Sequence, residues 1–141
     1  MDTDKASLID AGLTDRVIGV FFAVYNELGS GFVESVYENA FALALRQIGV
    51  DVQQQACLIV RFRNQVVGEF RIDLLVENRL VIELKAVAQL ASAHEVQLVN
   101  YLKASGLPIG LLFNFGQKPQ LKRKIFNLSK LDPPSSDLIR V

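Results

Sequence analysis

Two short, mainly apolar segments of this sequence contain the charged residues Asp73, within 70–76, and Glu83 and Lys85, within 80–87. A strand points alternate side chains to opposite faces, so Glu83 and Lys85 share one face. If the two segments pair as a hairpin, Asp73 joins them there. Two carboxylates a few ångströms apart repel and raise each other's pKa, unless a divalent cation between them holds both ionised. The pattern therefore indicates a metal site.

Two further acids, Glu34 and Glu38, stand one turn apart on a predicted helix over 34–48. The segment 29–33, Gly-Ser-Gly-Phe-Val, predicts a turn that brings the backbone in close and presents Glu34 to a site on the sheet. Two acids in a first helical turn usually interact with the helix dipole, and this interpretation is favoured for Glu38.

A third group of polar residues follows the strand charges along the chain. His94, Gln97 and Tyr101 stand at i, i+3 and i+7 of a predicted helix, so they fall within an arc of about 60°. The arc lies at the border between core and solvent. A surface histidine near a helix end is the simpler explanation of His94, which we leave out of the site.

Periodicity and turn residues predict one order of elements. A helix, a second helix and three antiparallel strands are followed by a third helix and two strands, over 14–28, 34–48, 50–62, 66–76, 80–87, 92–104, 109–115 and 121–128. Thr14-Asp15 and Ser92 are the expected caps of the first and third helices. Because a helix separates the third and fourth strands, those two can lie parallel in one sheet.

The composition fits one compact domain of 141 residues, half of them hydrophobic and 21% charged. The longest apolar stretch, 17–25, is too short to span a bilayer. The polar start of the chain differs from a secretory signal, so a cytoplasmic protein is expected. Cys57 is the single cysteine, which excludes an internal disulfide and predicts a small buried residue. The segment 132–141 is expected to be loose or to make an accessory contact.

The net charge is zero, which argues against a protein that coats nucleic acid by bulk electrostatics. The charge is nevertheless divided, with −5 over residues 1–60 and +5 over 61–141. The densest basic cluster is Lys118, Lys122, Arg123 and Lys124. It can contact a phosphate backbone, but a solvated edge strand protected by lysine is the favoured explanation.

The order of the charged residues resembles that of the PD-(D/E)XK nuclease superfamily: Asp73, nine residues, Glu83-Leu84-Lys85, and then Gln97-x-x-x-Tyr101 on the next helix. The stretch 31–37, Gly-Phe-Val-Glu-Ser-Val-Tyr, closely resembles the signature of one member, the GxxExxY family. The resemblance covers about residues 15–115. Ile72 stands where the superfamily name has proline, which is a common departure.

This resemblance implies an α/β (α+β) fold with a restriction-endonuclease-like core, in which helices flank a mixed β-sheet of about five strands. The whole chain, 1–141, would form a single nuclease-like domain with its core at about 15–130. In the site that it implies, Asp73, Glu83 and Glu34 hold Mg²⁺ or Mn²⁺. Lys85 orients the attacking water or neutralises charge at the scissile phosphate. Gln97 completes the catalytic set, and Tyr101 and Tyr37 position the substrate.

General chemistry agrees with such a site, because hard magnesium prefers carboxylate oxygen and lysine meets phosphate as a compact point charge. With one cysteine and no cluster of histidines, a zinc hydrolase is not expected. The first hypothesis is a metal-dependent phosphodiesterase acting on DNA, with RNA and a homodimer left open and no membrane partner. The second is a non-catalytic module that keeps the nuclease fold to bind nucleic acid or a protein. The third treats Asp73, Glu83 and Lys85 as a cross-strand ion pair with a spare acid.

Overall fold

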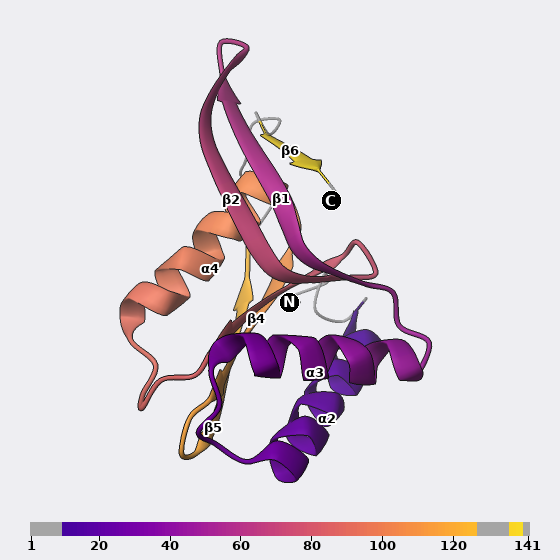
Figure 1. The fold of residues 1–141 in the computed structure, drawn as a ribbon. Helices are drawn as coiled ribbons and strands as arrows, with labels where there is room; N and C mark the ends of the chain where they lie inside the picture. Colours follow the sequence, from indigo (N-terminus) through magenta and orange to yellow (C-terminus); the bar gives the residue numbers. More distant parts are fainter. Residues whose placement is uncertain (1–9, 127–135, 140–141) are drawn as a thin grey trace, which may run out of the picture.

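The computed structural model describes residues 10–126 and 136–139. Within them the order of elements agrees with the prediction (Figure 1). The elements are α2 (Ala11–Leu28), α3 (Glu34–Gln47), β1 (Val52–Phe62), β2 (Gln65–Val76), β3 (Leu80–Lys85), α4 (Ser92–Ser105), β4 (Ile109–Phe115), β5 (Pro119–Ile125) and β6 (Ser136–Ile139).

The strands form one mixed sheet in the order β5-β4-β3-β2-β1-β6. β3 and β4 are parallel and are connected through α4, as expected, and the other neighbours are antiparallel. The predicted α/β (α+β) architecture with a restriction-endonuclease-like mixed sheet is confirmed. The short strand β6 was not predicted. It pairs with β1 in the segment expected to be loose or accessory.

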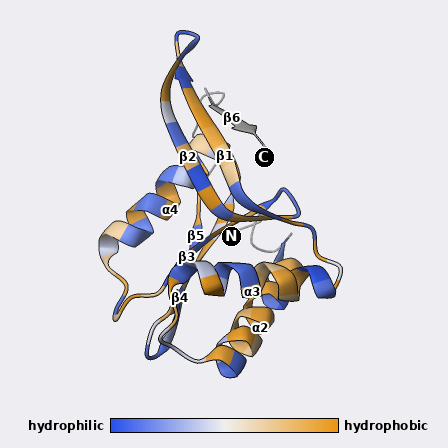
Figure 2. Ribbon diagram, viewed as in Figure 1, coloured by the Kyte–Doolittle hydropathy of each residue, from blue (hydrophilic) through white to orange (hydrophobic). Residues whose placement is uncertain are grey.

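Two apolar clusters cover the two faces of the sheet. The ribbon of α2 carries mainly hydrophobic residues (Figure 2). The larger cluster lies under the packed pair α2 and α3, and it contains Phe21 and Phe41 from the helices and Leu74 and Ile82 from the strands. The smaller lies under α4 and contains Val81 and Leu98, among others. Helices on both faces leave the strand residues of the middle of the sheet buried.

Strands β1 and β2 form a long hairpin that extends beyond the rest of the sheet (Figure 1). Its turn is made by Arg63 and Asn64, both with positive φ, a combination that matches the twist of a two-residue hairpin. The turn between β2 and β3 uses the same device at Glu77 and Asn78. Both turns lie where the sequence predicted them.

The alternation of side chains along β2 changes at Asp73. Residues two apart share a face in a regular strand. However, Leu74 packs in the α2–α3 cluster and Ile72 packs in the α4 cluster. The strand therefore rotates its faces by about half a turn within a few residues. Asp73 lies at the point of rotation.

The partner strand has an irregularity at the same level. Gln55 of β1 has a φ of 53°, which is in the left-handed region. The register passes from the pair Gln54–Leu74 to the pair Ala56–Ile72, with no pair assigned to Gln55. A distorted residue of this kind re-aims its side chain, and here it turns Gln55 toward the acids described below.

Several predicted boundaries were wrong by a few residues. α2 begins at Ala11, so Thr14 is a buried residue inside the helix and not its cap. α4 has Ala91 as its cap residue and no cap bond from Ser92; the Nδ1 of His94 accepts the N–H of Ala91 instead. β5 begins at Pro119, two residues earlier than predicted, and residues 127 and 128 of the predicted strand lie outside the described part.

Candidate functional site

Asp73 and Glu83 meet where β2 and β3 separate. The ladder between the two strands ends at the pair Leu74–Ile82. Beyond it, the backbone N–H of Asp73 donates to Oε1 of Glu83 at 3.2 Å, and the N–H of Leu84 donates to Oδ2 of Asp73 at 2.8 Å. Side-chain carboxylates thus replace the carbonyl groups that a continued ladder would supply. The predicted convergence of these two acids is present.

Both acids are costly to ionise where they lie. Burial, and then the charge of Asp73, raise the pKa of Glu83 to about 8, although hydrogen bonding and the charge of Lys85 oppose the shift. Burial also raises the pKa of Asp73 to about 6, against the hydrogen bond from Leu84. Glu83 is only 4% exposed. Such a pair stores electrostatic strain that a nearby cation would relieve.

Glu34 contributes to this pair less directly than predicted. It begins α3 on an exposed side of the helix, and its charge helps to raise the pKa of both Asp73 and Glu83. Over residues 10–126 and 136–139, no three acidic, histidine or cysteine side chains lie close enough together to hold one ion. Among the described residues, the predicted three-acid cluster is therefore not assembled in this arrangement.

Glu38 was expected to interact with the helix dipole, but it lies near Asp73 and is connected to it through Gln55. Its Oε1 accepts a hydrogen bond from Nε2 of Gln55 at 2.6 Å, and the same nitrogen donates to Oδ1 of Asp73 at 3.2 Å. The charge of Glu38 is a larger cause of the raised Asp73 pKa than that of Glu34. Helix-dipole stabilisation thus does not describe its main contacts. Its position one turn after Glu34, on the same helical face, was the available signal.

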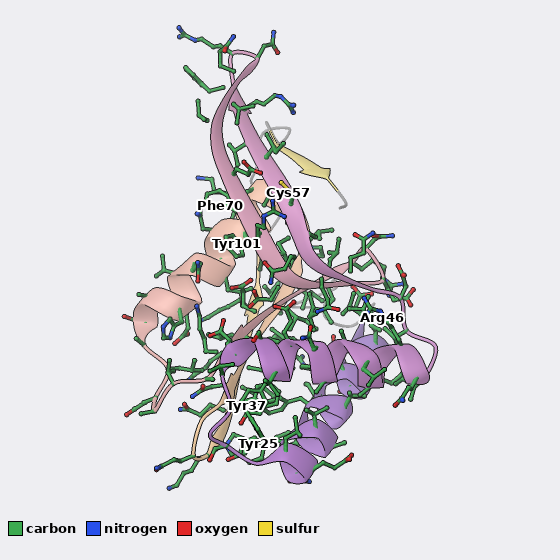
Figure 3. All side chains as sticks on the ribbon, in the orientation of Figure 1. Tyr25, Tyr37, Arg46, Cys57, Phe70 and Tyr101 are labelled. Atoms are coloured by element: carbon green, nitrogen blue, oxygen red, sulfur yellow. The ribbon has the colours of Figure 1, made fainter. Side chains whose placement is uncertain are left out.

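Gln97 and Tyr101 come to the site from α4, as their spacing predicted. Nε2 of Gln97 donates to the hydroxyl of Tyr101 at 3.0 Å. Burial, and then the charges of Glu83 and Asp73, raise the pKa of Tyr101 to about 12. Its ring lies 5.4 Å from that of Phe70, on the side of β2 that faces α4 (Figure 3). Tyr101 therefore stays protonated next to the acids and can donate a hydrogen bond.

Tyr37 lies away from this group, in the first turn of α3 (Figure 3). It is fully buried, and its ring stacks on Phe115 at 4.3 Å. Its hydroxyl donates to the carbonyl of Gly29 at 2.5 Å and accepts the N–H of Phe32 at 3.1 Å. Tyr37 therefore holds the turn that places Glu34. Its substrate-positioning role stays a prediction.

Lys85 ends β3 next to a loop that is fixed by Asn114. The buried amide of Asn114 accepts the N–H of Val87 and donates to the carbonyl of the same residue, both at 2.9 Å. It also donates to Gln120 of β5 at 2.8 Å. Because Lys85 and Asn114 are register partners across β3 and β4, this clamp limits the movement of the chain that carries the lysine.

The comparisons with known proteins agree with this geometry. A model of the PD-(D/E)XK nuclease superfamily matches residues 11–125. The chain belongs to the PD-(D/E)XK nuclease superfamily. A solved structure, the crystal structure of SSO0001, is similar in fold with a TM-score of 0.52 and 16% identity, and the match covers 68% of this chain and 52% of that one. This chain thus spans about half of that protein's length. A comparison with curated proteins found no significant match.

Members of this superfamily generally use divalent metals, and the residues present fit such an ion. The groups gathered around Asp73 include the carboxylate oxygens of Glu83 and Glu38, and carboxylate oxygen is a ligand that Mg²⁺ and Mn²⁺ prefer. Burial raises the pKa values of these two carboxyl groups, so a bound cation would offset the free-energy cost of ionising them.

In the part of the chain that the structure describes, no helix is both long and apolar enough to cross a membrane.

Proposed function

We propose that this chain is a metal-dependent nuclease of the GxxExxY type that hydrolyses phosphodiester bonds in DNA. The observation that carries the proposal is the buried pair Asp73–Glu83, linked through the backbone at the point where β2 and β3 separate, with Lys85 on the same strand face as Glu83. A buried pair of acids lowers the stability of a fold, and such pairs are found at functional sites. Membership of a nuclease superfamily makes metal binding the function that we assign to this pair.

In this proposal Asp73 and Glu83 hold Mg²⁺ or Mn²⁺, with Glu34 moving in from its exposed position on α3. The bound ion would supply a water of lowered pKa and stabilise the charge that develops on the phosphate. Lys85 orients the attacking water or neutralises the scissile phosphate as a point charge. Its charge already lowers the pKa of Glu83, which supports its place beside the pair.

Gln97 and Tyr101 hold the rim of the site on the α4 side. The hydrogen bond from Gln97 fixes the hydroxyl of Tyr101 and leaves the phenolic proton as a donor. A neutral donor next to the acids suits contact with a phosphate oxygen or with a metal-bound carboxylate. We therefore assign both residues to positioning of the DNA strand or of Glu83.

The test is cleavage of single-stranded, duplex and branched DNA, and of RNA, in Mg²⁺ or Mn²⁺. Glu83→Gln and Lys85→Ala should each abolish cleavage while the circular dichroism spectrum stays close to that of the parent and the unfolding midpoint does not fall. Glu69→Gln is the matched control, because Glu69 is an exposed acid of the same strand as Asp73 that contacts Cys57 instead. Retained cleavage in Glu83→Gln would rule out the proposed site.

A second function is favoured by one observation, the zero net charge of the chain. A nuclease fold without catalysis could bind nucleic acid or a protein partner, and a chain this small covers little duplex alone. This function predicts that all four substrates remain intact at every metal concentration. It also predicts that Glu83→Gln alters stability alone.

A further inference from the structure

We infer that Gln55 is a positioning residue that ties Glu38 of α3 to Asp73 of β2, and that Glu38 thereby belongs to the acidic set of the site. The inference rests on the proposed function, since it concerns how the proposed metal ligands are held. It goes beyond the sequence motifs, in which neither Gln55 nor Glu38 has a place.

The first step concerns the contacts of one nitrogen. Nε2 of Gln55 donates to Oε1 of Glu38 at 2.6 Å and to Oδ1 of Asp73 at 3.2 Å. A primary amide carries two N–H donors, so one neutral group satisfies two carboxylates at once. A carboxylate at position 55 would repel both acids, and an apolar side chain would leave both with fewer donors.

The second step concerns the backbone. A non-glycine residue with a φ of 53° is uncommon, and it costs free energy relative to extended backbone. In a regular strand Gln54 and Gln55 would point to opposite faces. Here both reach Glu38, because Gln54 donates to its Oε2 at 2.9 Å while Gln55 donates to its Oε1. The unusual conformation at Gln55 therefore brings two adjacent amides to one carboxylate.

The third step concerns what else holds the two acids. Gln54 also donates to Asn39 at 2.8 Å and accepts from Arg46 at 3.2 Å, so the support of Glu38 extends along α3. Asp73 has its second oxygen occupied by the N–H of Leu84. The side chain of Gln55 joins these two networks of hydrogen bonds. It links α3 to the pair of acids on β2 and β3.

The consequence is a prediction for metal affinity. Hydrogen bonds that orient a ligating carboxylate typically change metal affinity by about 10–100-fold when they are removed. We expect Gln55→Gly to raise the Mn²⁺ dissociation constant, measured by calorimetry, at least about tenfold. Glycine accepts a positive φ, so this variant keeps the backbone conformation while it removes the side chain that carries the amide.

Two companion variants separate positioning from folding. Gln55→Asn tolerates the same φ but carries an amide one methylene shorter, so it should weaken Mn²⁺ binding as Gln55→Gly does. Gln53→Ala is the matched control: Gln53 is two residues earlier on β1, and its buried Oε1 has no hydrogen-bond partner among the described residues. It should bind Mn²⁺ like the parent.

A second measurement uses the metal-free protein. In urea denaturation, Gln55→Gly should be non-additive with Glu38→Ala and also with Asp73→Ala, because one amide makes both contacts. It should be additive with Gln53→Ala. Additive behaviour with either acid would overturn the link. Unchanged Mn²⁺ affinity in Gln55→Gly would overturn the positioning role.

The outcomes distinguish this inference from the proposed function. Parent protein that binds Mn²⁺ and cleaves DNA, together with a Gln55→Gly variant that binds equally well, removes the inference and leaves the function. Parent protein that binds no Mn²⁺ removes the function and the positioning role together, and coupling in the metal-free cycles would then show that the amide serves stability alone.

Discussion

The backbone N–H of Asp73 donates to the carboxylate of Glu83, so two acids whose side chains repel are held together through the main chain of one of them. The bond opposes the rise in the pKa of Glu83 but does not cancel it, and that pKa stays near 8. The metal-free protein therefore contains a carboxyl group that remains protonated at neutral pH.

This protonation predicts the pH dependence of stability without metal. The pKa of Glu83 is raised from 4.5 to about 8 and that of Asp73 from 3.8 to about 6, so the folded state binds more protons than the unfolded state across about pH 4–8. Stability should be fully present below that window and fall as the pH rises through it, by on the order of a few kcal/mol. Urea denaturation in chelator from pH 4 to 9 measures the slope.

The matched variant for that slope is Glu83→Gln, whose carbonyl can still accept the N–H of Asp73. This variant should lose most of the pH dependence of the free energy of unfolding, and it should be more stable than the parent at pH 8. A parent protein that gains stability from pH 5 to pH 8 in chelator would contradict the buried-acid account.

Metal binding should show the opposite pH dependence. Ligating carboxylates must lose their protons, so Mn²⁺ binds more weakly as the pH falls through the raised pKa values of Glu83 and Asp73. We expect Mn²⁺ to raise the melting temperature more at pH 8.5 than at pH 6. At 100 times the dissociation constant the gain is about 2.7 kcal/mol. Differential scanning fluorimetry measures it, and an equal shift in Glu83→Gln would show that the ion binds elsewhere.

Tyr37→Phe tests whether Tyr37 acts on structure or on substrate. Loss of its hydroxyl leaves the carbonyl of Gly29 and the N–H of Phe32 without their partner, which should lower the free energy of unfolding by about 1–3 kcal/mol. Tyr25→Phe should cost less, because the Tyr25 hydroxyl donates to two carbonyls at a half-buried site that water can reach. Cleavage below the melting temperature should persist in Tyr37→Phe. A folded variant without cleavage would support the substrate-positioning role.

Gly116→Ala should destabilise the loop that follows Lys85. A Cβ at Gly116 would lie 2.3 Å from the carbonyl oxygen of Val87, a backbone atom that Asn114 holds in place. Overpacking of this kind costs about 1–3 kcal/mol or more. Gly110→Ala is the comparison, because its Cβ would meet the end of the Leu98 side chain at 2.7 Å, which can move more easily. In thermal unfolding, Gly116→Ala should have a lower melting temperature than Gly110→Ala. The reverse order would contradict the clamp that Asn114 forms on Val87.

Much of the fold could be predicted because it depends on patterns of residues that are close in sequence. The helical spacing of apolar residues, the turn residues at Arg63-Asn64 and Glu77-Asn78, and the apolar runs of β3 and β4 each depend on residues close in sequence. The same holds for the shared face of Glu83 and Lys85 and for the pairing of Gln97 with Tyr101 one turn later.

The tertiary structure decided which acid of α3 is tied to Asp73, and what Tyr37 does. Strict alternation predicts one face for Ile72 and Leu74, and only the packing of α4 and of α2–α3 on opposite sides of the sheet separates them. The left-handed φ of Gln55 has no local sequence signal, because glutamine does not favour that region. The contact through Gln55 joins β1 to α3. Such a contact depends on separate segments of the chain, so periodicity within one element cannot reveal it.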